Sequence, residues 1–380
     1  MRLLIFTLAL VLTAAPAYAQ LGGLGKTLGK ANDAANKAQK LKDLHISDAD
    51  ERKIGEQVSQ LVRTEYGVFQ DKAVTKYVSL VGMALAKAST RPDLRWEFIV
   101  LDTDGVNAFA SPGGIVHITR GALGFIKSEA ELAGVLAHEV AHITKKHTVN
   151  AIRNNKTFEL GADMAPGSNA LIEGLANVAY DNIVEKGFDR GDEEDADAVG
   201  IKLANSMAYN PAGLGTFLTK LVERNKDQEP QKGRNALFAS HPETKGRIDK
   251  LNRLIKSEKL TGTAMVQARY AAAITFDVKP LAEIATVVAG TRGVAGGDSK
   301  AAPAKETKAE EPPRKKGFGI GSLNLSKGKQ AESTQASASA GNRAIGPDRL
   351  AKGGSNPSKL TLPPITPAEL EAFKKGIQAG

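Results

Sequence analysis

The most regular alternation of apolar and polar positions lies in residues 128–150. Apolar side chains recur there at the three- and four-residue spacing of one helical face: Leu132, Val135, Leu136 and Val140. Ser128 followed by Glu131 forms a capping box, which predicts that the helix begins at Ser128. We expect the rest of the chain to be organised around this helix.

Similar spacing predicts further helices on both sides of this segment. Before it, one helix follows Ser47, and a second ends at Arg91-Pro92. After it, helical patterns follow in four segments: residues 171–184, 189–203, 213–222 and 266–275.

The period changes from helical to two in residues 96–101, which predicts a strand. A short strand at 107–110, a tight turn at 112–114 and a returning strand at 115–119 follow. The pattern predicts an α+β, mainly helical fold with a small sheet beside the central helix. A peptidase commonly holds its substrate as an added strand, although a purely structural hairpin is the alternative. The candidates for contacts to a substrate strand are Asn107, Ala108, Phe109, Ala110, Gly113 and Gly114.

The central helix contains His138-Glu139-Val140-Ala141-His142. Four residues make about one turn, so His138 and His142 share a face and both imidazoles can reach one metal ion. Glu139 lies roughly 100° further round the helix, where it can reach a water on that ion without being a ligand. This spacing is typical of zinc peptidases. The alternative is a solvated helix with two unrelated histidines, but the small apolar residues around the motif favour a buried face.

An acidic run at residues 189–197 opens a later helix. Negative charge suits the start of a helix, which is the simpler explanation. A second explanation is metal binding, because two histidines leave a catalytic zinc ion one protein ligand short. Glu193 and Asp197 are one turn apart, so Glu193 could bind zinc while Asp197 accepts the second N–H of a ligand histidine. Further on, His241 precedes Arg247, although a lone histidine is more often structural or solvated.

The amino-acid composition limits which side chains can form a metal site or a catalytic site. The chain has 380 residues and no cysteine, which excludes disulfides, thiolate zinc ligands and a cysteine nucleophile, so any metal site must use histidines and carboxylates. The net charge of +9 is modest and includes no dense basic run with interleaved aromatic residues. It favours attraction to anionic surfaces over nucleic-acid binding.

The start of the sequence predicts export. Arg2 precedes an apolar run at residues 3–12, and residues 17–19 read Ala-Tyr-Ala, a cleavage pattern. We expect residues 1–19 to be a signal peptide cleaved after Ala19, which places the mature protein in a bacterial periplasm. A retained anchor is the alternative, but the run is short for a bilayer span. No later stretch approaches eighteen apolar residues, so we expect no transmembrane span in the mature chain.

Differences in composition along the sequence predict three segments after the signal peptide. Residues 20–45 are expected to be a flexible lead-in; the Gly-Lys-Thr at 25–27 lacks the glycine and preceding strand of a phosphate loop. Residues 46–290 would form a zinc metalloprotease domain. We expect residues 291–380 to be a low-complexity, mostly disordered tail, because few large apolar residues are present. A short helix at 367–378 is possible, although a solvated end is favoured.

Taken together, these motifs resemble one gluzincin family. H-E-V-A-H, the hairpin at 107–114, E-E-D-A-D and S-H-P…R occur in its order and approximate spacing, over roughly residues 45–255. The family includes the CAAX prenyl endopeptidase, the membrane protease HtpX and soluble periplasmic BepA-like proteases. The chain looks most like the soluble exported branch. The resemblance implies a zincin fold and one Zn²⁺ per chain.

Carried over residue by residue, the resemblance implies three zinc ligands: His138, His142 and Glu193. It implies Glu139 as the catalytic base and Asp197 as a carboxylate that supports a ligand histidine.

The resemblance also concerns the residues that follow. His241 matches a histidine that can approach the zinc and close the site, and Arg247 matches a basic residue of the same motif; either could stabilise an oxyanion or gate access. Asp195 stands where the family often has a glutamate. The helical repeats of BepA-like proteins are absent after residue 280, which puts a similar set of partners in doubt.

The sequence therefore predicts an exported zinc-dependent endopeptidase. The resemblance implies misfolded or unassembled envelope proteins as substrates, and we further expect association with an anionic envelope surface or the outer-membrane assembly machinery. The alternative is a periplasmic chaperone or assembly factor with a structural or latched zinc site. Hydrolysis of peptidoglycan amides is also open, because the same chemistry cleaves any suitably held amide.

Overall fold

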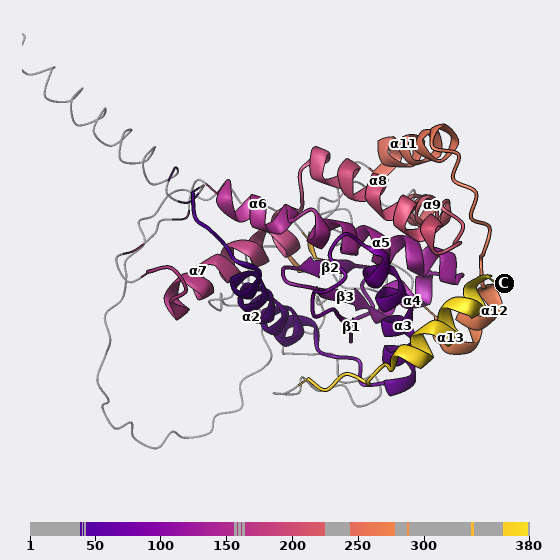
Figure 1. The fold of residues 1–380 in the computed structure, drawn as a ribbon, viewed down its shortest axis with the longest axis horizontal. Helices are drawn as coiled ribbons and strands as arrows, with labels where there is room; N and C mark the ends of the chain where they lie inside the picture. Colours follow the sequence, from indigo (N-terminus) through magenta and orange to yellow (C-terminus); the bar gives the residue numbers. More distant parts are fainter. Residues whose placement is uncertain are drawn as a thin grey trace, which may run out of the picture.

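The computed structural model describes residues 39, 41, 43–155, 158, 161, 164–224, 244–277, 287–288, 336–337 and 360–378. These residues are mainly helical and enclose a three-stranded sheet (Figure 1). The fold is therefore α+β, as expected. Its main helices are α2 Asp48–Tyr66, α3 Lys72–Ala88, α4 Arg120–Phe125, α5 Glu129–Thr144, α6 His147–Arg153, α7 Asn169–Tyr180, α8 Arg190–Ser206, α9 Gly213–Arg224, α11 Thr244–Ser257, α12 Gln267–Ala273 and α13 Pro367–Gln378, with a π-helix η1 at Asp181–Lys186.

The sheet has the order β1-β3-β2. β2 (Ala108–Ser111) and β3 (Ile115–Thr119) form the predicted antiparallel hairpin. Its turn contains Gly113 at φ +72° and Gly114 at φ +98°, a region that favours glycine. β1 (Glu97–Leu101) pairs with β3 in parallel, although β2 lies between them in the sequence. A further short pair, β4 Val287–Val288 and β5 Ala336–Ser337, lies apart from this sheet in the chain.

The sheet separates two apolar cores. Phe98 and Val100 pack into the first core with α3, α5 and α9, whereas Ile99 and Leu101 pack into the second core with α2 and α7. This alternation confirms the period of two in residues 96–101. Both faces of the sheet are therefore covered, and α5 lies against one of them.

The helix α5 is buried from Glu129 to Ile143. Ser128 Oγ accepts a hydrogen bond from the Glu131 amide at 3.2 Å, which confirms the predicted start. Neighbouring helices approach closely where glycines face them. A Cβ on Gly200 of α8 would lie 3.0 Å from the His138 backbone nitrogen, and one on Gly134 would lie 2.5 Å from the Leu214 nitrogen of α9. The helix that carries H-E-x-x-H is thus fixed on several sides.

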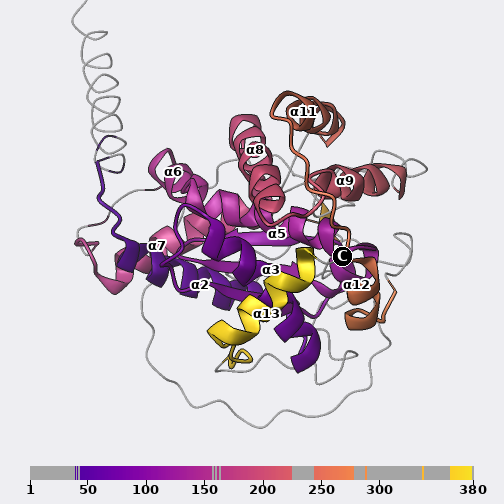
Figure 2. The same ribbon diagram turned by 45° about the vertical axis from the view of Figure 1, so that its right-hand side comes forward.

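The two ends of the described chain are more ordered than expected. Leu41, within the predicted lead-in, is buried in the second core. The expectation of a solvated end at residues 367–378 is wrong, because α13 buries Leu370, Phe373 and Ile377. These side chains recur at helical spacing and give α13 one apolar face. The helix lies along α3 (Figure 2). The predicted signal peptide and most of the predicted tail lie outside the described residues.

Among the helices that the structure describes, none combines the length and apolar character needed to cross a membrane.

Candidate active site

The helices α5 and α8 bring three metal-binding side chains together. The Nε2 atoms of His138 and His142 are 3.1 Å apart. Glu193, in the first turn of α8, places Oε1 3.4 Å from His142 Nε2 and Oε2 3.6 Å from His138 Nε2. Tetrahedral zinc with bonds of about 2.0–2.2 Å holds its ligand atoms roughly 3.3–3.6 Å apart. The donor set and its spacing therefore fit one zinc ion.

The site is withdrawn from bulk solvent. His142 is fully buried, and His138, Glu139 and Glu193 are each no more than 4% exposed. A buried carboxylate among histidines needs a positive charge to offset its desolvation, which Arg247 supplies and a bound cation would add to. Glu139 follows His138 directly on α5, so its carboxylate belongs to the same buried region without being part of the ligand triangle.

Asp197 supports the first histidine ligand. Its Oδ1 lies 3.0 Å from His138 Nδ1, one helical turn after Glu193. A carboxylate this close favours a proton on Nδ1, which would leave Nε2 free of a proton and near Glu193. Burial by itself would raise the pKa of Asp197, but hydrogen bonds from Arg247 and His138 outweigh burial and lower it. Asp197 therefore stays ionised and fixes the tautomer of His138.

Arg247 reaches the same carboxylates from α11. It donates to Asp197 through Nε at 2.8 Å and Nη2 at 2.6 Å, while Nη1 lies 2.6 Å from Glu193 Oε2. The side chain is 4% exposed. Burial opposes its charge, but the hydrogen bonds and charges of the two acids raise its pKa. One guanidinium thus holds both Asp197 and Glu193 in place.

His147, which sequence reasoning missed, supports the second histidine ligand. Its Nδ1 lies 2.9 Å from Nδ1 of His142, and its Nε2 lies 3.3 Å from Asp195 Oδ2. If His142 offers Nε2 to a metal, its Nδ1 carries the proton and donates to His147. His147 then carries its own proton on Nε2 and donates to Asp195. The signal in the sequence was a third histidine five residues after His142.

The backbone at α6 explains how His147 reaches this position. Lys146, just before the helix, adopts a left-handed conformation with φ +58°. This turn ends α5 and directs His147 back toward His142, whose ring is stacked on Phe188 at a centroid distance of 4.0 Å. Phe188 follows the π-helix η1, an irregular helix of the kind that often occurs at functional sites.

A polar cavity of about 640 Å³ lies beside this side of the site. Its wall includes Phe188 and Asp192, which also contact His142 and His147. The other walls are asparagine-rich: Asn150, Asn154, Asn155 and Asn182.

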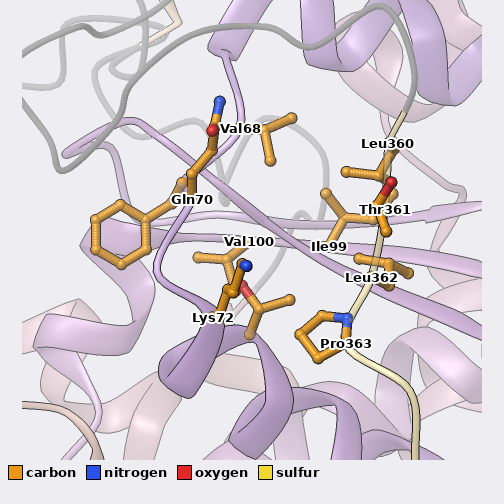
Figure 3. A pocket seen from close by; sticks show the side chains of 11 residues that line it. Val68, Gln70, Lys72, Ile99, Val100, Leu360, Thr361, Leu362 and Pro363 are labelled. Carbon is orange, nitrogen blue, oxygen red and sulfur yellow. The ribbon is translucent and has the colours of Figure 1, made fainter.

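A second cavity, of about 240 Å³, lies between β1 and residues 360–363 and includes none of the metal-site residues (Figure 3).

The strand candidates lie on and around β2. Ala108, Phe109 and Ala110 belong to this strand, which pairs with β3 on one side; within the described chain no strand pairs with its other side. Asn107 caps the strand with a hydrogen bond from the Ala108 amide to its own Oδ1. Gly113 and Gly114 form the turn.

The turn glycines are packed on two other segments: Gly113 on α2, and Gly114 on Leu94 and Arg95 before β1. The Gly113 amide donates to Glu51 at 3.1 Å, and a Cβ there would lie 2.5 Å from Arg52 Cα. Their contacts are therefore with the fold itself. His241 lies outside the described residues, so its approach to the metal site stays a prediction.

The fold and this site define a metallopeptidase domain of the zincin type, with H-E-x-x-H on a buried helix and a glutamate on a second one. Comparison with known proteins agrees. The model of Peptidase family M48 matches residues 72–255, a region that includes every metal-site residue named above. That region belongs to Peptidase family M48.

Individual relatives match a similar part of the chain. The mitochondrial metalloendopeptidase OMA1 of Schizosaccharomyces pombe is 32% identical over 205 residues, which are 53% of this chain and 60% of that protein. The beta-barrel assembly-enhancing protease of Escherichia coli is 26% identical over 218 residues, which are 53% of this chain and 43% of that protein. The chain therefore spans only about half the length of these relatives.

Proposed function

We propose that this protein is a zinc-dependent endopeptidase. The observation that carries the proposal is the convergence of the buried side chains of His138, His142 and Glu193, whose ligand atoms lie within 4.8 Å of one another; Glu139 follows His138 directly on α5. Zinc held there would polarise a peptide carbonyl and lower the pKa of water. Three protein ligands leave a fourth position open, as a catalytic site requires.

Residues of the chain would supply the proton transfer and the positioning of the ligands. Glu139 would take a proton from the attacking water and pass it to the nitrogen of the departing amine. Asp197 and His147 hold the two ligand histidines in the tautomers that present Nε2. We assign Arg247 a positioning role, because its guanidinium contacts Asp197 and Glu193. His241 remains a candidate for closing the site or stabilising the oxyanion.

Substrate binding along β2 is part of this proposal. Pairing of an extended peptide with a strand edge uses main-chain hydrogen bonds and tolerates many sequences. β2 lies next to α5, so a peptide bound along it would pass close to the metal site. Such recognition suits unfolded segments of proteins.

The substrates we propose are misfolded or unassembled envelope proteins. The support is the similarity to beta-barrel assembly-enhancing proteases, together with the signal-peptide pattern in residues 1–19. We further propose export to the periplasm and association with the envelope surface. A pulse of labelled precursor should yield a mature protein that begins at Gln20; retention of the full precursor in the membrane would contradict this.

A glutamate pair on α8 provides a matched test of the metal site. Glu193 is 1% exposed and points to the histidines, whereas the next residue, Glu194, is partly exposed and pairs with Arg190 and Lys250. Glu193→Ala should lose bound zinc and casein cleavage, and Glu194→Ala should keep both. Full zinc occupancy in Glu193→Ala would exclude Glu193 as the third ligand.

Retention of zinc without cleavage by the wild type would favour an assembly factor instead. A chelator would then abolish the ability to prevent aggregation of an unfolded client, with no proteolysis to lose.

A further inference from the structure

The surface formed by α3, α12 and the start of α5 is covered by the far end of the chain. The helix α13 lies along α3 and beside α12 in both ribbon views (Figures 1 and 2). Its Phe373 packs edge-on against Tyr77 of α3, with ring centroids 6.3 Å apart. Ile377 is fully buried in the first core. This end lies outside residues 72–255, the part matched by the peptidase family.

The sequence of α13 is built to form a helix that docks. Thr366 Oγ1 accepts from the Glu369 amide at 3.2 Å, and Glu369 Oε2 accepts from the Thr366 amide at 2.8 Å. This reciprocal pair is a capping box, and Pro367 occupies the first helical position. Lys76 of α3 meets Glu369 at 2.5 Å. Local signals therefore start the helix where its apolar face meets α3.

The segment before α13 extends the contact to the sheet. Residues 360–363 line the cavity beside Val68, Phe69 and Ile99 (Figure 3). Leu360 and Leu362 pack against the second core, whereas Phe373 and Ile377 belong to the first. Residues 360–378, which we call the C-terminal clamp, therefore bridge both cores.

One side chain connects the clamp to the catalytic helix. Arg269 of α12 lies over the Phe373 ring, 4.1 Å from its centroid, and donates to the Phe373 carbonyl at 3.4 Å. The same guanidinium donates to Glu129, the first residue of α5, through Nε at 2.6 Å and also through Nη2. Glu129 is fully buried and also accepts from the hydroxyls of Tyr77 and Tyr209.

The consequences follow from burial. The Phe373 ring covers one face of the Arg269 guanidinium, so removal of the ring would expose the Arg269–Glu129 pair to more solvent screening. Glu129 is the first residue of the helix that continues to His138 and His142, so the hydrogen bonds to its carboxylate help to fix the start of α5. A clamp that leaves its surface would loosen this first turn.

The contact has the properties of a reversible intramolecular ligand. The helix α13 has 12 residues, of which three side chains are buried, whereas a stable interface uses roughly 20–30 residues a side. Residues 278–359 join it to the domain, and such a connection gives an effective concentration of at most roughly millimolar. Docking of the clamp on its own chain is thus favoured, yet a free peptide of the same sequence can displace it.

We infer that the C-terminal clamp is a dissociable intramolecular ligand that holds the start of the catalytic helix through Arg269 and Glu129. The inference goes beyond the proposed function and does not rest on it. The occupant of the surface is the chain's own residues 360–378, and a second copy of this segment is its competitor.

The test uses the full chain with a specific protease site inserted within residues 291–358, cut after folding. The cut protein should retain its C-terminal fragment on gel filtration, and excess synthetic peptide of residues 360–378 should displace it. The same peptide carrying Phe373→Ala should compete at least tenfold more weakly. Peptide with Lys375→Ala, an exposed position on the same helix, should compete like the wild type.

Amide hydrogen exchange separates positioning of α5 from a merely local contact. In the cut chain, the Phe373→Ala change should allow dilution and gel filtration to remove the clamp. Amide hydrogen exchange in the first two turns of α5 should then accelerate at least tenfold. Exchange in α7, whose main packing partner is α2 and not α13, should change less than twofold. Added wild-type peptide should restore protection.

Two results would overturn the inference. A fragment that separates at once with unchanged exchange in α5 would show that the clamp holds nothing. A fragment that no excess of peptide displaces would show that residues 360–378 are a permanent part of the fold. Both readouts are independent of peptidase activity, so an inactive protein would leave the test intact.

Discussion

The histidine behind the second metal ligand allows a quantitative prediction. In His147→Ala, the buried Nδ1–H of His142 loses its acceptor at 2.9 Å, and the ring loses the contact that fixes its tautomer. Loss of an acceptor for a buried donor costs about 1–3 kcal/mol. Removal of a group that orients a metal ligand lowers metal affinity about 10–100-fold, which corresponds to about 1.4–2.7 kcal/mol. The lost hydrogen-bond acceptor and the lost orienting group therefore give similar free-energy costs.

The assay is a zinc competition titration against a chelating dye, followed by unfolding of the metal-free protein. We expect His147→Ala to bind zinc about 10–100-fold more weakly. His147→Asn should recover part of that loss, because its side-chain oxygen can accept from His142. His45→Ala is the matched control, since His45 is exposed.

Asp195→Asn should have a smaller effect than His147→Ala. Asp195 is 41% exposed and reaches His147 at 3.3 Å, so water can replace part of its role. A zinc affinity of His147→Ala within twofold of the wild type would refute the argument that His147 fixes the tautomer of His142.

Three further predictions concern stability. Arg247→Met should lower the free energy of unfolding of the metal-free protein by about 3–5 kcal/mol, because it leaves buried Asp197 and Glu193 without their counter-charge; urea unfolding with a chelator measures this, and a loss below about 1 kcal/mol would contradict it. Burial lowers the pKa of His117 to about 3, so the folded state binds fewer protons than the unfolded state between that pKa and the ordinary value near 6.5. Stability should therefore fall as pH drops through this window, by about 2 kcal/mol at pH 5 relative to neutral pH, and His117→Gln should flatten the difference; equal slopes for both proteins would reject the assignment. Gly113→Ala should destabilise by about 2 kcal/mol or more in the same unfolding assay, because φ is +72° and a Cβ would meet the backbone of α2; a change within about 0.5 kcal/mol would show that the turn can relax.

Local signals made much of this structure predictable. The H-E-x-x-H helix, its capping residue and the hairpin at 107–119 all depend on spacing within a few residues, and all are present. The acid at position 193 was identifiable because the chemistry of zinc required a third ligand. The role of Asp197 was predictable because this residue lies one helical turn after Glu193.

What the sequence did not reveal depends on contacts between distant segments. The parallel pairing of β1 with β3 leaves no periodic mark, because the same alternation fits either orientation. Arg247 meets Asp197 across fifty residues of sequence, so its ion pairs with the site were invisible until α11 was placed against α8. The docking of α13 was misjudged because its three apolar residues gave no sign of the surface that receives them.

In the proposed function, Glu139 on α5 acts as a base beside a zinc ion held by His138, His142 and Glu193. The most direct test is the zinc content and casein cleavage of Glu139→Gln beside the wild type, each without residues 1–19. The account predicts one zinc per chain in both proteins, with cleavage by the wild type and none by Glu139→Gln. Cleavage by Glu139→Gln at the wild-type rate would contradict the account, because a neutral amide cannot accept the proton of the attacking water.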